Sequence, residues 1–372
     1  DTEIEVYLIR ALSGEEVARV KSRQSDTVGQ LQQSAAEQVG MSTTAIVLLL
    51  GAQTLQAKET LASAGIQDGA IVYVMCRRGG LVISSAHDRF AKVWDVDSGQ
   101  CILTIKEHHR VNSSAVSPDG SLVATASDDG VAKIWNAKSA ECVLTLAGHA
   151  SAVMSASFSL DGASLVTGSR DTTAMVWNVS SGQRTLVLAG HSKPLRPAAF
   201  SEDGQLIITG SEDCSAKVWR SQDGSNPLTL TGHRMAVFVA TFSHSGGCIL
   251  TGSFDGTVMI WNTESGECLR TLVPHKAESV CSVAFSPDDQ SIMTCSPFDR
   301  EVIVWSTDDM KATAVLLHGS MPSSAAWLPD GRTIVTGTCI GNVHVWSSET
   351  GQCSNTIRGH KGLVTSISFA GM

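Results

Sequence analysis

Serine or threonine, histidine and aspartate recur together along most of this 372-residue chain. In one example, His149 is followed by Thr167 after 18 residues and by Asp171 after 22. A hydroxyl, an imidazole and a carboxylate in contact could form a catalytic triad, with the imidazole as general base. A triad is unique within an enzyme, whereas sets of this kind occur six times here at nearly constant spacing. The repetition favours a structural hydrogen-bonded network, and no other constellation of catalytic or metal-ligating residues is visible.

Each set is followed by a tryptophan that ends a short alternating run such as AKVW or AKIW. Successive tryptophans are 41 to 44 residues apart, and they are Trp94, Trp135, Trp177, Trp219, Trp261, Trp305 and Trp346. A fixed period of this size marks one supersecondary unit that is copied and stacked. Turn sequences such as Ser117-Pro118-Asp119-Gly120 separate the alternating runs, so each unit is predicted to contain four short strands.

The spacing of Gly-His, Asp and Trp resembles that of the WD-repeat family, the β-propellers of the β-transducin type, over residues 81–372. In that family the His, Ser/Thr, Asp and Trp of one blade form a hydrogen-bonded tetrad, which implies the same role here. Buried Asp and His side chains are tolerated when they are paired in this way. The expected tetrads are His108, Thr125, Asp129 and Trp135; His149, Thr167, Asp171 and Trp177; His191, Thr209, Asp213 and Trp219; His233, Thr251, Asp255 and Trp261; and His360, Ser84, Asp88 and Trp94.

The last two units depart from this pattern. In the sixth unit, the threonine of the pattern, Thr294, is shifted by one position relative to Asp299. In the seventh unit, Ile340 stands where the aspartate is expected. His318 and Thr336 are therefore predicted to lack an acceptor, so the seventh blade should be the loosest part of the ring, while six tetrads should be intact.

The first and last repeats complete each other. The chain enters the repeat region at Leu81 in what matches the second strand of a unit, and Gly359-His360 followed by LVTSISFAGM matches a first strand. The expected fold is mainly β: a seven-bladed β-propeller in residues 81–372, closed by the C-terminal strand. Such closure leaves no exposed sheet edge to aggregate.

Residues 1–80 show none of this periodicity. They read as two strands, a helix and two further strands. Thr27 and Gln30 form a capping-box pattern at the start of the helix, and apolar residues at helical spacing line one of its faces. The order resembles an α+β ubiquitin-like (β-grasp) domain, on the segments ALSG, SDTV, LLLG, TLQAKETLASAGIQ and RRGG.

The ubiquitin-like resemblance places that family's partner-binding patch on Leu12, Leu49 and Val74. An outward apolar patch needs a cover, and two covers remain open: a ubiquitin-receptor partner or the propeller of the same chain. The resemblance also raises protease cleavage after Gly80, as in ubiquitin precursors. A short linker between two strands is favoured, because a protease needs an accessible extended segment.

Composition bounds the partners and the compartment. The formal net charge is −9, which disfavours non-specific binding to nucleic acid or anionic membranes. No apolar run reaches transmembrane length and no secretory signal is visible; the chain begins with Asp, so N-terminal sequence is expected to be missing. None of the ten cysteines forms a CxxC pair. Cys101, Cys142, Cys268 and Cys353 share one repeat position, which predicts core-filling thiols and a reducing compartment, the cytoplasm or nucleus.

Loops on the narrow face of WD propellers bind partners, and here their residues differ around the ring. The first four blades present mixed charges, whereas blades five to seven present Met235, Phe254, Phe298 and Met321. Exposed aromatic and Met side chains resemble interface hot spots, so this sector is the predicted client-binding site. The alternative is that these side chains fold into their own loops.

The two resemblances together imply a non-catalytic adaptor without a cofactor. The propeller would bind a client protein, and the ubiquitin-like domain would dock a ubiquitin receptor or the proteasome. The alternative is an assembly factor, because ubiquitin-like domains ahead of WD propellers resemble factors of large ribosomal subunit maturation, and regular propellers resemble factors of axonemal dynein assembly.

Overall fold

In the computed structural model, the chain divides into two compact units, residues 1–80 and 81–372. The structure describes residues 3–10, 16–39, 46–50, 53–55, 58–76, 81–276 and 279–369.

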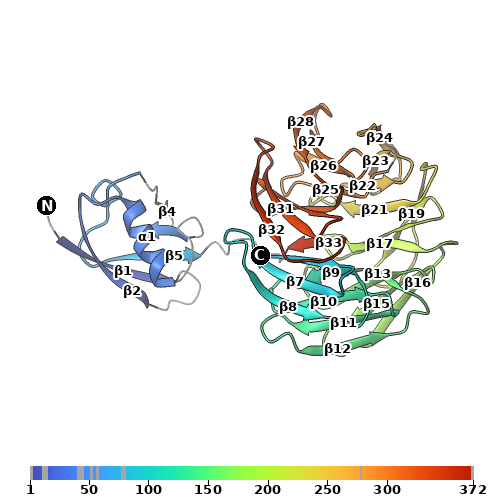
Figure 1. Cartoon of the computed structure of the whole chain (residues 1–372), viewed down its shortest axis with the longest axis horizontal. Helices are drawn as coiled ribbons and strands as arrows, with labels where there is room; N and C mark the ends of the chain where they lie inside the picture. The colour runs from blue at the N-terminus through green and yellow to red at the C-terminus, as the bar shows by residue number, and fades with distance from the viewer. Residues whose placement is uncertain are drawn as a thin grey trace. The chain divides into compact units, whose positions relative to one another are not determined.

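Within its described residues, the first unit contains a five-stranded sheet and one helix (Figure 1). In chain order the elements are β1 (Glu3–Arg10), β2 (Glu16–Arg23), α1 (Val28–Val39), β3 (Ile46–Leu50), β4 (Gln53–Thr54) and β5 (Ala70–Cys76). The sheet order is β2-β1-β5-β3-β4, and β1 and β5 run parallel at its centre. A helix that follows the antiparallel β1–β2 pair, with the last strand β5 pairing parallel to the first strand β1, is the ubiquitin-like arrangement that the sequence predicts.

The helix begins at the predicted capping box. The backbone N–H of Thr27 donates to Gln30 Oε1 over 2.7 Å, and the backbone N–H of Gln30 lies 3.4 Å from Thr27 Oγ1. Reciprocal bonds of this kind satisfy amides that have no partner within the helix. The apolar helix face, including Val28, Leu31 and Ala35, is buried against alternate residues of the sheet. This core holds the unit together.

The second unit consists of seven four-stranded antiparallel sheets, numbered here as blades one to seven. Blades one to four contain β33 (Val364–Phe369), β6 (Leu81–Ala86), β7 (Phe90–Asp95) and β8 (Cys101–Lys106); β9 (Val111–Val116), β10 (Leu122–Ser127), β11 (Val131–Asn136) and β12 (Cys142–Ala147); β13 (Val153–Phe158), β14 (Ser164–Ser169), β15 (Thr173–Asn178) and β16 (Arg184–Ala189); and β17 (Leu195–Phe200), β18 (Leu206–Ser211), β19 (Ser215–Arg220) and β20 (Leu228–Thr231).

Blades five to seven contain β21 (Val237–Phe242), β22 (Cys248–Ser253), β23 (Val258–Asn262) and β24 (Cys268–Leu272); β25 (Ser282–Phe285), β26 (Ser291–Ser296), β27 (Glu301–Ser306) and β28 (Ala312–Leu317); and β29 (Pro322–Trp327), β30 (Thr333–Thr338), β31 (Asn342–Ser347) and β32 (Cys353–Arg358). The second strand of each blade is almost wholly buried, whereas the outer strand exposes most of its side chains. Burial therefore decreases outward along each blade.

The C-terminal strand closes the ring, as the sequence predicts. β33 pairs antiparallel with β6, so the first blade is built from both ends of the repeat region. Each inner strand contacts the inner strand of the next blade, in the order β9, β13, β17, β21, β25, β29, β33 and back to β9. Figure 1 shows the blades following one another in chain order from cyan to red. The predicted fold class, a mainly β propeller that follows a ubiquitin-like unit in the sequence, is confirmed.

Candidate functional site

In four blades the histidine, hydroxyl, aspartate and tryptophan form one continuous hydrogen-bonded chain. In blade three, Trp177 Nε1 donates to Thr167 Oγ1 over 2.9 Å, and His149 lies 2.8 Å from both Thr167 Oγ1 and Asp171 Oδ2. Blades four and five repeat the arrangement with Thr209 and Thr251 as the hydroxyl residues. Each tetrad joins the second and third strands of its blade, the turn between them and the loop that precedes the inner strand.

The tetrad of blade one joins residues from both ends of the repeat region. Ser84 Oγ lies 2.8 Å from His360 Nε2, and His360 Nδ1 lies 3.0 Å from Asp88 Oδ2. Trp94 Nε1 donates to Ser84 Oγ over 2.7 Å. The ring is therefore closed by side-chain hydrogen bonds as well as by strand pairing.

The direction of the bonds follows from the groups themselves. Because tryptophan can only donate, the threonine hydroxyl accepts from it and donates its own proton to histidine Nε2, which leaves Nδ1–H to donate to aspartate. Burial lowers the pKa of His191, so the imidazole is neutral. Burial alone would raise the pKa of Asp213, but hydrogen bonds from Ser215 and His191 outweigh it and lower that pKa to about 2. Such a network has a structural role, because the hydroxyl that would serve as a nucleophile is held by hydrogen bonds to both the tryptophan and the histidine.

In blade two the prediction that His108 belongs to the tetrad is wrong. His108 is exposed, and Glu107, a residue that is only 2% exposed, takes its place. The Glu107 carboxylate accepts a hydrogen bond from Thr125 Oγ1 over 2.7 Å and forms an ion pair with Lys133. Trp135 still donates to Thr125. Asp129 instead caps its own turn by accepting from the Val131 amide. The blade therefore has a buried carboxylate–ammonium pair where the others have neutral imidazole.

In blade seven the expected loss of an acceptor is also wrong. His318 Nε2 lies 2.8 Å from Thr336 Oγ1, and Nδ1 lies 3.0 Å from the backbone carbonyl oxygen of Leu316. Trp346 Nε1 donates to Thr336 as in the other blades. A main-chain carbonyl thus replaces the missing aspartate. Blade six keeps the Trp305–Thr294 bond at 3.0 Å but has a different arrangement around its histidine. Intact tetrads accordingly number four and not six.

The prediction of core-filling cysteines at one repeat position is wrong as well. All four thiols, those of Cys101, Cys142, Cys268 and Cys353, are exposed. Each begins an outer strand, whose far side has no neighbouring strand, and pairs with the tryptophan of the third strand at a bulge. A repeated position in a propeller therefore does not imply burial. These exposed thiols do not indicate a reducing compartment by filling the core.

The four predicted partner-binding residues of the propeller are exposed and lie on one face. The Phe254 amide donates to the carbonyl of Ala236, beside Met235, and the Cys339 amide donates to the carbonyl of Met321. These bonds join the loop before the inner strand to the turn after the second strand, so both segments lie at one edge of each blade. We call the face formed by these edges the narrow face. Phe298 lies in the corresponding turn of blade six and is 58% exposed.

Further apolar side chains extend this set beyond the prediction. Val273 and Leu317 follow or end outer strands at the same edge, and Ile340 occupies the turn of blade seven. The exposed large apolar residues at the narrow face are Met235, Phe254, Val273, Phe298, Leu317, Met321 and Ile340. All belong to blades five to seven; among the described residues, blades one to four expose none at this edge. We call these seven residues the apolar sector.

One member of the apolar sector, Phe254, packs against other side chains of the propeller. The ring of Phe254 packs on Phe238 with centroids 5.4 Å apart, and the Arg196 guanidinium lies 4.4 Å above Phe238. Arg196 also pairs with Glu212 over 3.3 Å. Phe254 is therefore partly folded onto its own blade, yet 38% of it stays exposed. Held rings lose little side-chain entropy on binding, which suits an interface.

The predicted patch of the ubiquitin-like unit falls largely outside the described residues. Leu12 and the Gly79-Gly80 junction are not described. Leu49 and Val74 lie on β3 and β5, which pair with each other in the sheet. In the described part of the chain, no helix is long and apolar enough to cross a membrane.

Family models match both units of the chain. The WD domain, G-beta repeat model matches residues 99–136 and 140–178, and the model of the IFT122 first beta-propeller matches residues 194–372. The ubiquitin family model matches residues 8–79. By fold and tetrads the second unit is a β-propeller. The chain is a WD-repeat propeller protein with an N-terminal ubiquitin-like domain.

Curated relatives match shorter stretches. Autophagy-related protein 16 of Arabidopsis thaliana is 27% identical over 93 residues, which are 25% of this chain and 18% of the relative. Meiotic recombination protein rec14 of Schizosaccharomyces pombe is 32% identical over 90 residues, which are 24% of this chain and 30% of the relative. The chain thus spans less than a third of either relative. Both domain families are typically non-catalytic and serve as protein-interaction modules.

Proposed function

We propose that this protein is a non-catalytic adaptor that binds a client protein through the apolar sector of its propeller and docks a ubiquitin-system partner through its ubiquitin-like domain. The supporting observation is the confinement of the exposed large apolar residues of the narrow face to three consecutive blades. Single exposed apolar residues are ordinary on protein surfaces, but a set gathered on one face marks an interaction site. The client is accordingly a protein with a complementary apolar surface.

The test is affinity purification of the full chain carrying Phe254→Ala and Phe298→Ala, with quantitative identification of the captured proteins. The matched control carries Ile102→Ala and Val143→Ala, which remove apolar side chains that are 56% and 54% exposed from outer strands. We expect the first pair to reduce capture of a defined client set at least about tenfold, because a hot-spot aromatic contributes about 2 kcal/mol or more. Equal capture by the folded wild type and the first variant contradicts client binding at this surface.

The ubiquitin-like arm is tested separately in the full chain. Leu49→Ala and Val74→Ala together should release ubiquitin receptors or proteasome subunits while leaving the clients of the apolar sector bound. Release of preribosomal particles or dynein-assembly components instead would support the assembly-factor alternative. No change in any captured protein would contradict a docking role for this domain.

A further inference from the structure

Blade six differs from the other blades in one residue position and one chain insertion. In blades three to five the aspartate comes four positions after the threonine. In blade six the turn between β26 and β27 is one residue longer, so Asp299 comes five positions after Thr294. Two residues after the aspartate, blades three to five have Thr173, Ser215 and Thr257, and blade six has Glu301. A second carboxylate thus replaces a hydroxyl beside the histidine.

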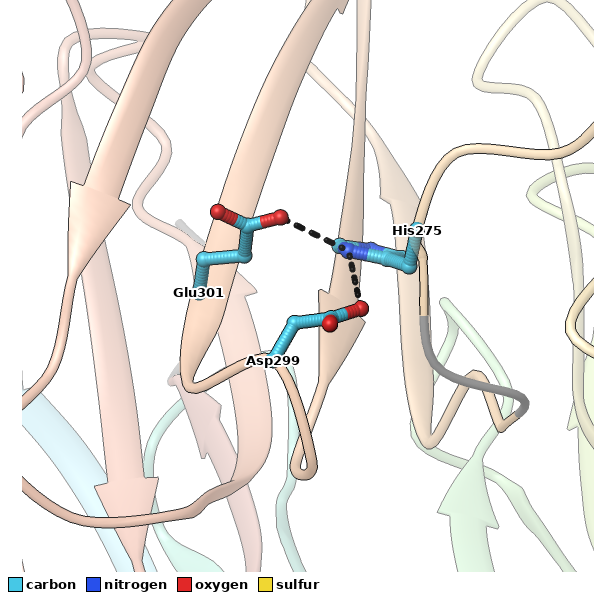
Figure 2. Close-up of side chains that lie close together, drawn as sticks. All are labelled: His275, Asp299 and Glu301. Carbon is cyan, nitrogen blue, oxygen red and sulfur yellow. Dashed lines mark ion pairs between the residues drawn. The ribbon is translucent and has the colours of Figure 1, made fainter.

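These changes detach the histidine from its tetrad. The His275 side chain is 0% exposed, yet neither of its ring nitrogens has a hydrogen-bond partner among the described residues. Its Nδ1 lies 3.8 Å from Asp299 Oδ2 and 3.5 Å from Glu301 Oε1, compared with 2.8 Å between the same nitrogen and the aspartate in blades three and four. Figure 2 shows both carboxylates directed at the imidazole, where the two ion pairs meet at the same ring nitrogen. A buried polar group without a protein partner is commonly satisfied by an ordered water or an ion.

We propose that His275, Asp299 and Glu301 form a binding site for one divalent transition-metal ion, with Zn²⁺ as the best-matched ion. The donor atoms of the three side chains all lie within 4.8 Å of one another. Imidazole and carboxylate ligands hold Zn²⁺ at about 2.0–2.2 Å in a tetrahedral arrangement, which places ligand atoms about 3.3–3.6 Å apart. The observed separations of 3.5 and 3.8 Å are close to this value and longer than the 2.8 Å of the tetrad hydrogen bonds in blades three and four.

The charges favour a cation at the same point. Imidazole coordinates a metal ion in its neutral form, and the Nδ1 atom of His275 faces both carboxylates. Two carboxylates then face a neutral ring in a largely buried place, and a divalent ion would neutralise both. Three protein ligands leave a fourth position for water or for a group from a partner.

The site would hold together two segments of the narrow face. His275 belongs to the loop after β24, and Asp299 and Glu301 flank the start of β27, directly after Phe298 of the apolar sector. A bound ion would join the loop to the turn in blade six, where the inserted residue has lengthened the turn and removed the tetrad. The ion would thereby fix the position of Phe298.

The test measures Zn²⁺ binding by the full chain after removal of metals with a chelator. The matched variant is Glu301→Thr, which gives blade six the hydroxyl found at this position in blade five, and Glu301→Gln keeps the side-chain volume. We expect one Zn²⁺ per wild-type chain that both variants bind at least about 100-fold more weakly, and a rise in the melting temperature with Zn²⁺ in the wild type only.

The exposed thiols could bind metal by themselves, so the location of the ion needs its own readout. All variants retain these cysteines, and Co²⁺ bound at His275 would lack the sulfur-to-metal absorption band that thiolate ligands produce. Anomalous scattering from a Zn²⁺-loaded crystal should place the ion between the three side chains. Equal Zn²⁺ affinity in wild type and Glu301→Thr, or no binding at micromolar Zn²⁺, would overturn the proposal.

Discussion

Glu107 takes the tetrad position in blade two that histidine holds in the four blades with intact tetrads. The stability of blade two should therefore depend on Glu107 and not on His108. Its carboxylate is buried between the Thr125 hydroxyl and the Lys133 ammonium. Glu107→Ala should lower the free energy of unfolding by about 2–3 kcal/mol, because it leaves a hydroxyl and a charge without their partner. Urea denaturation of the full chain measures this change.

The neighbouring residue provides the control for Glu107. His108→Ala should change the free energy of unfolding by less than about 0.5 kcal/mol, since the side chain is exposed. A larger loss from His108→Ala than from Glu107→Ala would contradict the description of blade two. The distinction was available in the sequence: Glu107, His149, His191 and His233 all lie 22 residues before their aspartate, and His108 lies 21 before. The prediction chose His108 because it is a histidine, although Glu107 has the correct spacing to the aspartate.

His318 makes the stability of blade seven dependent on pH. Burial lowers its pKa from 6.5 to about 4, so the unfolded chain takes up a proton more readily than the folded one. The contribution of His318 to the free energy of unfolding is therefore fully present above pH 6.5. It is lost as the pH falls toward 4, by about 3 kcal/mol in total. His318→Gln should abolish this part of the pH dependence in urea denaturation at pH 7, 5.5 and 4. Parallel curves for the two proteins would show that His318 does not titrate in this way.

At the scale of elements, the junction between blade seven and blade one depends on one glycine. A Cβ atom at Gly337 in β30 would overlap the side chain of Val364 in the closing strand β33. Gly337→Ala should therefore cost about 1–3 kcal/mol, as overpacking typically does. Gly319→Ala is the control, because nothing lies within 4 Å of its added Cβ. Equal stability of the two variants would mean that β33 does not pack against β30 as described.

The strands themselves were largely predictable, and the details at their ends were not. Alternation, turn sequences and the tryptophan period define the four strands of each blade, because these signals are local. The backbone acceptor for His318 Nδ1 was not predictable, since it depends on the conformation of the preceding strand end. Exposure of Cys101 was missed because a repeat position does not reveal which side of the outer strand lacks a neighbour.

At the scale of the whole molecule, the ring closure could be read from the match of the C-terminal segment to a first strand. The sequence also identified four residues of the apolar sector, because they occupy loop positions that the family leaves exposed. Val273, Leu317 and Ile340 were missed, since their exposure depends on the end of an outer strand or on a turn. The separation of His275 from its carboxylates required coordinates, although Glu301 in place of a hydroxyl was a visible signal.

The central claim is that clients bind the narrow face over blades five to seven. Hydrogen–deuterium exchange of the full chain, alone and with a captured client, tests it most directly. We expect slower exchange in residues 234–236, 254–256, 297–300 and 319–321, and unchanged exchange in the corresponding loops of blades one to four. Protection confined to blades one to four, or to the outer strands, would contradict the claim.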